Sequence, residues 1–273
     1  MITILKKYFS AMLLLAITLT MIIGGCKKSP IQAAKTTYAL LVKDQLGVSG
    51  TITFTQTSSS ITTVTIVLVG ADSAYHPAFI RSNSAVEGGG IVVTLNPVSG
   101  GTSTTQVIET DNHASINYSQ LISYDGYADV DESSLNLPLI IAQGDIGGNA
   151  LTSTNITYAL DTVGTLAVSG TALFAKRLNG NTLVSVSLTG TIAGNIYPES
   201  IHLGSVTTVG GGPIVKTLNA VNGSTGKGFT NIRALDDSTI VTYDNLLVYD
   251  GYLAVQQSAV TTASICQGNI GTH

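Results

Sequence analysis

The stretch YSQLISYDGYADV, residues 118–130, occurs a second time as YDNLLVYDGYLAV, residues 243–255. Seven of the thirteen positions are identical, and both copies contain Tyr-Asp-Gly-Tyr. The similarity continues upstream, where YALLVKDQLGVSGTITF (38–54) aligns with YALDTVGTLAVSGTALF (158–174). A period of about 120 residues is longer than that of a solenoid repeat. The chain is therefore predicted to contain two tandem copies of one domain.

A further pair of segments marks where each copy ends. IIAQGDIG (140–147) aligns with SICQGNIG (264–271). We predict domain 1 at residues 38–148 and domain 2 at 158–273, each near the usual size of a domain. The polar segment between them, NALTSTNIT (149–157), is expected to be a short join.

Residues 1–25 are typical of a bacterial lipoprotein signal peptide. A short basic segment precedes an apolar run that ends at Ile23, and small residues stand before Cys26. This pattern resembles the lipobox, in which the cysteine is lipidated and becomes the mature N-terminus. The alternative is an uncleaved anchor, since about 18 apolar residues can span a bilayer. Both interpretations predict an extracytoplasmic chain that is held at the cell envelope, and a lipidated chain would be anchored in the outer membrane. Residues 26–37 would form a flexible tether.

Composition narrows the class of protein. Without residues 1–25, ten basic and 16 acidic side chains remain, which gives a net charge of about −6. No cluster of basic residues is left to contact phosphates, so nucleic-acid binding is not expected. Charged residues make up only 10% of the chain, and β-branched residues are abundant, which is typical of a β-rich protein. Cys266 follows an apolar run and is expected to be a buried, inert thiol.

Each copy shows a pattern of strands and turns. Segments such as TTVTIVLVG (62–70) alternate apolar and polar residues, which predicts strands with one buried face. Gly-rich stretches separate them. Tyr118 and Leu121 have helical spacing, which predicts a short helix in each copy. We expect this helix to end at Gly126 in the first copy and at Gly251 in the second. Several antiparallel strands in about 110 residues indicate a β-sandwich.

Both copies resemble the CHRD domain, which is named from chordin and is common in exported bacterial proteins. The matching features, in order, are a strand after Ser-Gly-Thr, a His-Pro segment, a Gly-rich turn, Tyr-Asp-Gly-Tyr and a closing Ala-Gln-Gly-Asp-Ile-Gly. The resemblance spans nearly all of the chain after the signal peptide. It implies an all-β protein with two tandem immunoglobulin-like β-sandwiches, distantly similar to copper/zinc superoxide dismutase.

The resemblance also raises the question of a metal site. Many CHRD domains carry His-x-x-His-x-His where this chain has HPAFIR (76–81), and a further histidine after the Gly-Tyr segment. Here only His76 of that pattern is present in the first copy, and only His202 in the second. One histidine in each copy does not make a tight site, so no metal or other cofactor is expected. We predict that both are remnants, hydrogen-bonded or exposed.

Two further groups of residues have structural and functional interpretations. Asp129, Asp131 and Glu132 lack the spacing of a calcium loop and are predicted to form a solvated acidic turn. The Tyr-Asp-Gly-Tyr segments are predicted to be corners, with a glycine at positive φ and an aspartate bonded to its own backbone. The alternative is an aromatic platform for a ligand. The tyrosines in question are Tyr124, Tyr127, Tyr249 and Tyr252.

The sequence thus predicts a lipid-anchored envelope protein that is not an enzyme and acts as a binding or structural module. Its partner would be an envelope or extracellular protein or a glycan. The competing hypothesis is a metal-binding or redox protein on a dismutase-like scaffold with a degenerate histidine site. A third, a carbohydrate-active enzyme, requires two close carboxylates. The sequence contains no nucleophile elbow and no zinc-protease motif, which favours the first hypothesis.

Overall fold

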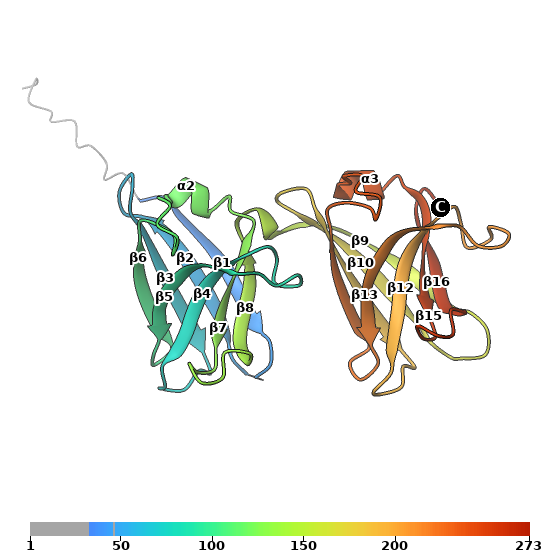
Figure 1. The fold of residues 1–273 in the computed structure, drawn as a ribbon, viewed down its shortest axis with the longest axis horizontal. Helices are drawn as coiled ribbons and strands as arrows, with labels where there is room; N and C mark the ends of the chain where they lie inside the picture. The colour runs from blue at the N-terminus through green and yellow to red at the C-terminus, as the bar shows by residue number, and fades with distance from the viewer. Residues whose placement is uncertain (1–32, 46) are drawn as a thin grey trace, which may run out of the picture. The chain divides into compact units, whose positions relative to one another are not determined.

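The structure is a computed structural model that describes residues 33–45 and 47–273. Residues 35–273 cluster as one compact unit and contain two eight-stranded antiparallel sheets (Figure 1). The prediction of an all-β fold is confirmed. The predicted signal peptide and Cys26 lie outside the described residues. The expected tether ends earlier than residue 37, because the first strand begins at Lys35.

Domain 1 is a sheet with the order β5-β4-β7-β8-β1-β2-β3-β6. A short helix lies between its sixth and seventh strands, and a 3-10 turn follows the last strand. The elements are β1 (Lys35–Val42), β2 (Ser49–Gln56), β3 (Thr62–Val69), β4 (His76–Ser82), β5 (Ile91–Val98), β6 (Thr102–Val107), α2 (Tyr118–Leu121), β7 (Gly126–Asp131), β8 (Ile140–Ile146) and η1 (Gly147–Asn149).

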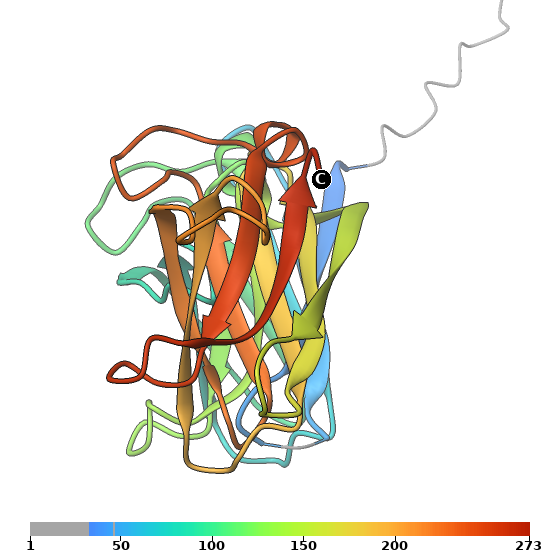
Figure 2. The same cartoon turned by 90° about the vertical axis from the view of Figure 1, so that its right-hand side faces the viewer.

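Domain 2 is a closed barrel with the order β10-β11-β14-β13-β12-β15-β16-β9, whose curl Figure 2 shows from one side. Its elements repeat those of domain 1 in the same sequence. They are β9 (Leu151–Thr162), β10 (Ser169–Arg177), β11 (Thr182–Thr189), β12 (Ile196–Leu203), β13 (Ile214–Asn222), β14 (Lys227–Ile232), α3 (Tyr243–Leu246), β15 (Asp250–Gln256) and β16 (Ser264–Gly271).

One expectation about the architecture needs correction. Residues 149–157 were expected to be a join, but β9 begins at Leu151 and pairs along β10 from Arg177 to Gly170. The expected β-sandwiches differ from the structure only in detail, since the second sheet closes on itself and the first is barrel-like. The alternation of apolar residues shows which face is buried, and it leaves open how the sheet edges meet.

The gap between the edge strands of domain 1 is spanned by a side chain. Asn96 of β5 donates from its backbone N to Thr105 Oγ1 at 2.8 Å and from Nδ2 to the Thr104 carbonyl at 2.7 Å. In domain 2, Asn219 makes the same two contacts to Thr230 and Phe229, each at 2.8 Å. These contacts link the edge strands β5 and β6 of domain 1, and in domain 2 they add to the backbone pairing between β13 and β14.

The alternating pattern of the strands places their apolar residues inside. In β3 the buried positions are every second residue, as in β11. Each domain has its own core, to which all its strands contribute. Large apolar side chains with almost no exposure include Phe54, Leu40, Ile52, Ile66, Ile80, Leu121, Ile141 and Ile146 in domain 1, and Phe174, Leu160, Tyr243, Ile201, Ile232, Leu246, Leu253 and Ile270 in domain 2.

The predicted short helix is present in both domains. Asn117 and Thr242 close the two N-termini with capping boxes, in which side chains bond the free backbone amides. Both helices end one turn later at Ile122 and Leu247, before the glycine that was expected to end them. Across the described residues, no helix is both long and apolar enough to cross a membrane.

The glycine of Tyr-Asp-Gly-Tyr has a different role from the one predicted. Gly126 is the first residue of β7 and does not have a positive φ. A Cβ at Gly126 would lie 2.6 Å from the Arg81 carbonyl oxygen and 2.7 Å from the ring of Tyr124. Gly251 is constrained in the same way by His202. Glycine is required because the tyrosine ring and a neighbouring strand approach the backbone closely.

Candidate functional site

The two histidines are held by hydrogen bonds and lie in different domains. His76 is buried, with Nδ1 2.8 Å from the Glu132 carbonyl and Nε2 3.0 Å from Asp72 Oδ1. His202 has Nδ1 2.8 Å from the Gly212 carbonyl and Nε2 2.9 Å from Ser200 Oγ. Both ring nitrogens of each histidine are thus engaged by protein atoms. The residues present do not fit a tight copper or zinc site.

The acidic residues of β7 are not a solvated turn, and this prediction is wrong. Asp129 and Asp131 lie on a strand and are 1% and 0% exposed. Arg81 on β4 donates Nε to Asp129 Oδ2 at 2.6 Å, and its Nη2 lies 3.6 Å from Asp131 Oδ2. The guanidinium also lies 4.9 Å from the centre of the Phe79 ring. The neighbouring strand and the arginine cover the carboxylates, which sequence alternation alone does not reveal.

This cluster contains two carboxyl groups and one guanidinium. Burial and, after it, the charge of Asp129 raise the pKa of Asp131 to about 7, although the charge of Arg81 acts to lower it. Burial also raises the pKa of Asp129. A second cation near these carboxylates would meet the fixed charge of Arg81. In the part of the chain that the structure describes, no three His, Cys, Asp or Glu side chains gather closely enough to hold a metal ion.

The four tyrosines have mainly internal contacts. Tyr127 and Tyr252 are each 5% exposed. The hydroxyl of Tyr252 accepts a hydrogen bond from the Gly212 amide at 3.0 Å, and its ring stacks on His202 at 4.8 Å. Tyr124 and Tyr249 are partly buried beside the following glycine. These contacts are those of corner residues, and the aromatic rings do not form one exposed platform.

Domain 2 contains a buried carboxyl group that sequence reasoning missed. Glu199 on β12 is 2% exposed and pairs with Val255, which in turn pairs with the buried Cys266. Neither of its carboxyl oxygens has a hydrogen-bond partner within residues 33–45 and 47–273. Burial raises the pKa of Glu199 to about 8. Burial and the nearby Glu199 together raise the pKa of Cys266 to about 12. Both groups are therefore neutral at pH 7, and Cys266 is the buried thiol that was predicted.

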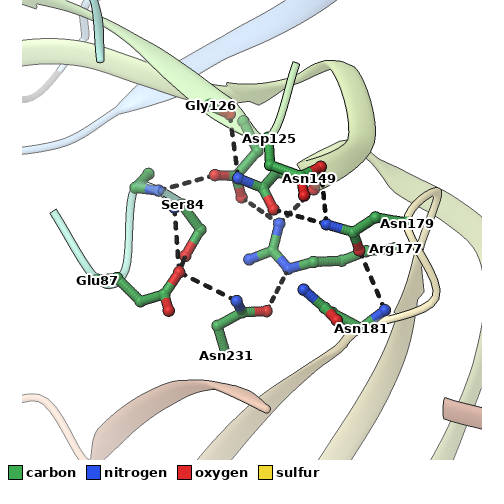
Figure 3. A network of polar contacts seen from close by, with 11 residues as sticks. Ser84, Glu87, Asp125, Gly126, Asn149, Arg177, Asn179, Asn181 and Asn231 are labelled. Atoms are coloured by element: carbon green, nitrogen blue, oxygen red, sulfur yellow. Dashed lines mark hydrogen bonds and ion pairs between the residues drawn. The ribbon is translucent and has the colours of Figure 1, made fainter. Parts of the chain in front are cut away.

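A network of polar side chains connects the end of domain 1 to the β10–β11 hairpin of domain 2 (Figure 3). Its centre is Arg177, which is fully buried. Arg177 Nη1 donates to Asp145 Oδ2 at 2.7 Å and to the Asn149 carbonyl, and Nε donates to Asn231 Oδ1 at 2.8 Å. Asn231 Nδ2 in turn donates to Glu87 Oε2 at 3.0 Å. Domain 1 thus supplies the counter-ion for a guanidinium of domain 2.

The hairpin adds further contacts beside Arg177. Asn179 Nδ2 donates to Asp125 Oδ1 and to Asn149 Oδ1, each at 3.0 Å. Burial opposes the ionisation of Glu87, but hydrogen bonds from Ser84 and Asn231 and the nearby Arg233 outweigh it and lower the pKa of Glu87. Each charged side chain of the network therefore has at least one partner, and among the buried side-chain atoms of the network only Nη2 of the Arg177 guanidinium is left without one within the described residues.

Next to this network lies a cavity of about 230 Å³, which we call the junction pocket. Four asparagines, two acidic residues, one arginine and one isoleucine surround it, and both domains contribute. They are Asn83, Glu87, Asp125, Asn149, Asn181, Asn231, Arg233 and Ile240. Arg233 is exposed. Carboxamides offer both donors and acceptors in one side chain, so the pocket matches a ligand with many hydroxyl groups.

Sequence reasoning identified none of the residues of the junction pocket as functional. A usable signal was the difference between the two copies. The register of the alignment places Arg177 opposite Thr57. A charged residue that replaces a small one at an equivalent strand position indicates a contact that only one copy makes.

A scan of family models, a search of curated proteins and a search of solved structures each gave no match to this chain. The resemblance to CHRD domains therefore stays a prediction from the motifs.

Proposed function

We propose that this chain is a lipid-anchored cell-envelope protein with two CHRD-like domains that acts as a non-enzymatic binding module, and that its ligand is a glycan held in the junction pocket. The observation that carries the proposal is the pocket itself, which forms only where the two domains meet. Ligand sites are frequent at such domain interfaces.

The chemistry of the pocket supports a hydroxyl-rich ligand. Asn181 presents a carboxamide, Glu87 and Asp125 present carboxylate acceptors, and Arg233 presents donors. A cavity of about 230 Å³ is smaller than the roughly 300–1,000 Å³ of sites for drug-sized molecules. That size suits one sugar unit of a longer glycan, whose neighbouring units would remain in solvent.

Binding of sugars tests the proposal directly. We would titrate a panel of neutral and N-acetylated monosaccharides and disaccharides and record saturation-transfer NMR spectra. Arg233→Ala should weaken binding about tenfold or more, since a hydrogen bond to a charged group contributes about 1.5–3 kcal/mol. Asn181→Ala removes a neutral hydrogen bond of about 0.5–1.5 kcal/mol and should weaken binding about two- to tenfold. Asn155→Ala, at an exposed asparagine of β9, is the matched control and should leave binding unchanged. Binding that both pocket variants leave intact contradicts the assignment of the pocket.

The anchor is tested separately from the ligand. We expect the chain to incorporate labelled fatty acid and to fractionate with membranes. Cys26→Ser should abolish the label, because the lipid is proposed to attach at this residue. Label that persists in the variant would overturn the proposed lipidation, and it would leave the test of the pocket unaffected.

A further inference from the structure

The residues that connect the domains differ between the two copies. Arg177 ends β10, and the equivalent residue after β2 is Thr57. Asp145 on β8 has Asn269 as its counterpart on β16. Each member of the ion pair is therefore replaced by a neutral residue at the equivalent position of the other domain. The pair can form in one order only, with the end of domain 1 against the hairpin of domain 2.

Arg177 depends on domain 1 for its charge balance. Of its three acceptors, only Asn231 belongs to domain 2, and that acceptor is neutral. Asp145 and the Asn149 carbonyl belong to domain 1. A fully buried guanidinium without a counter-ion is strongly destabilising, whereas the paired group is tolerated. The buried arginine thus favours conformations in which the two domains remain in contact.

The connecting segment is bonded to the same hairpin. The amide of Leu178 donates to the Ala150 carbonyl at 2.9 Å, and the amide of Asn179 donates to the Gly148 carbonyl at 2.8 Å. Gly148 is itself held by the Tyr124 carbonyl at 3.2 Å. Within the described residues, no unbonded linker separates η1 from β9, because the backbone carbonyl groups of Gly148 and Ala150 accept hydrogen bonds from the hairpin.

We infer that the end of domain 1 is a docking surface specific for the β10–β11 hairpin of domain 2, and that Arg177 fixes the two domains as one rigid body. This goes beyond the proposed function and holds whether or not the junction pocket binds a glycan. A rigid junction keeps the pocket assembled before any ligand arrives, so binding does not have to supply the cost of ordering two domains.

Distance measurements between spin labels test the inference in the full-length chain. In a Cys26→Ser background, labels would be attached at Val67→Cys on β3 and Ala220→Cys on β13, both exposed positions. The buried Cys266 should resist the reagent. Double electron–electron resonance should give one narrow distance distribution. A broad distribution in this parent chain would overturn the inference at once.

Two variants remove the ion pair from opposite sides. Arg177→Thr introduces the residue of domain 1, and Asp145→Asn introduces that of domain 2. Each should broaden the interdomain distribution. A second label pair inside domain 2, at Ala220→Cys and Ile156→Cys, should stay narrow and shows that the barrel remains folded. If Arg177→Thr unfolds domain 2, the interdomain distance distribution of the Asp145→Asn variant provides the test. An interdomain distribution as narrow in that variant as in the parent would refute the role of the pair.

Discussion

The stability of domain 2 should depend on the protonation of Glu199. The unfolded chain releases this proton near the ordinary pKa of 4.5, whereas the folded barrel holds it up to a pH of about 8. Because the folded pKa is raised, the stabilisation is fully present below pH 4.5 and is lost as the pH rises to about 8. At about 1.4 kcal/mol for each pKa unit, the loss amounts to about 5 kcal/mol over this window.

Glu199→Gln removes the charge and keeps the shape. The free energy of unfolding of the parent should fall relative to this variant by about 5 kcal/mol between pH 4.5 and 8, and the difference should level off at higher pH. Glu199→Ala provides a second comparison, since Ala78 occupies the equivalent position in domain 1. The free energy of unfolding of Glu199→Ala should also lack the pH dependence that Glu199 contributes, and it should be lower by a constant amount because of the lost side-chain volume.

The assay can report domain 2 alone. With Cys26→Ser, the only remaining thiol is Cys266, inside the same barrel. Urea unfolding at each pH would be followed by short pulses of a thiol reagent, so that labelling counts the molecules in which domain 2 is open. Parallel pH profiles for the parent and Glu199→Gln would refute the argument, because they would show that the carboxyl group is not desolvated in the folded state.

Three further outcomes are expected. The Asp131→Asn variant should gain stability relative to the parent between pH 4 and pH 8. Burial and Asp129 raise the pKa of Asp131 to about 7, so the parent loses stability as the pH rises from 3.8 to that value. An equal pH dependence of urea unfolding in both proteins would contradict this. Tyr252→Phe should cost about 1 kcal/mol through the lost bond to a backbone amide, whereas Tyr75→Phe at an exposed loop should cost nothing measurable by the same assay. Cys266 should react with iodoacetamide only after denaturation, because burial raises its pKa to about 12; rapid modification of the folded chain would disprove its burial.

Much of the fold is determined locally, and local features are visible in the sequence. The duplication follows from matching segments at a constant period. The strands follow from alternation, since successive side chains in a strand point to opposite faces. The short helices follow from the spacing of Tyr118 and Leu121, and the burial of Cys266 from its apolar surroundings. Each of these depends on residues that are neighbours in the chain.

The candidate site depends on contacts across the chain. The acidic group at residues 129–132 was predicted to be a solvated turn because polar residues are usually exposed, yet Arg81 from another strand covers Asp129 and Asp131. The closure of the second sheet was likewise undetermined, because it depends on how its first and last strands meet, and not on the pattern within any strand.

Composition and periodicity alone thus determine an all-β chain of two related domains. Only the tertiary structure decides that Arg177 lies against Asp145, and that Glu199 lies inside a barrel where domain 1 has Ala78. The physical reason is that the free energy of a charged group depends on its burial and its partners. Those partners come from residues as far apart as Glu87 and Asn231, which only the folded chain brings together.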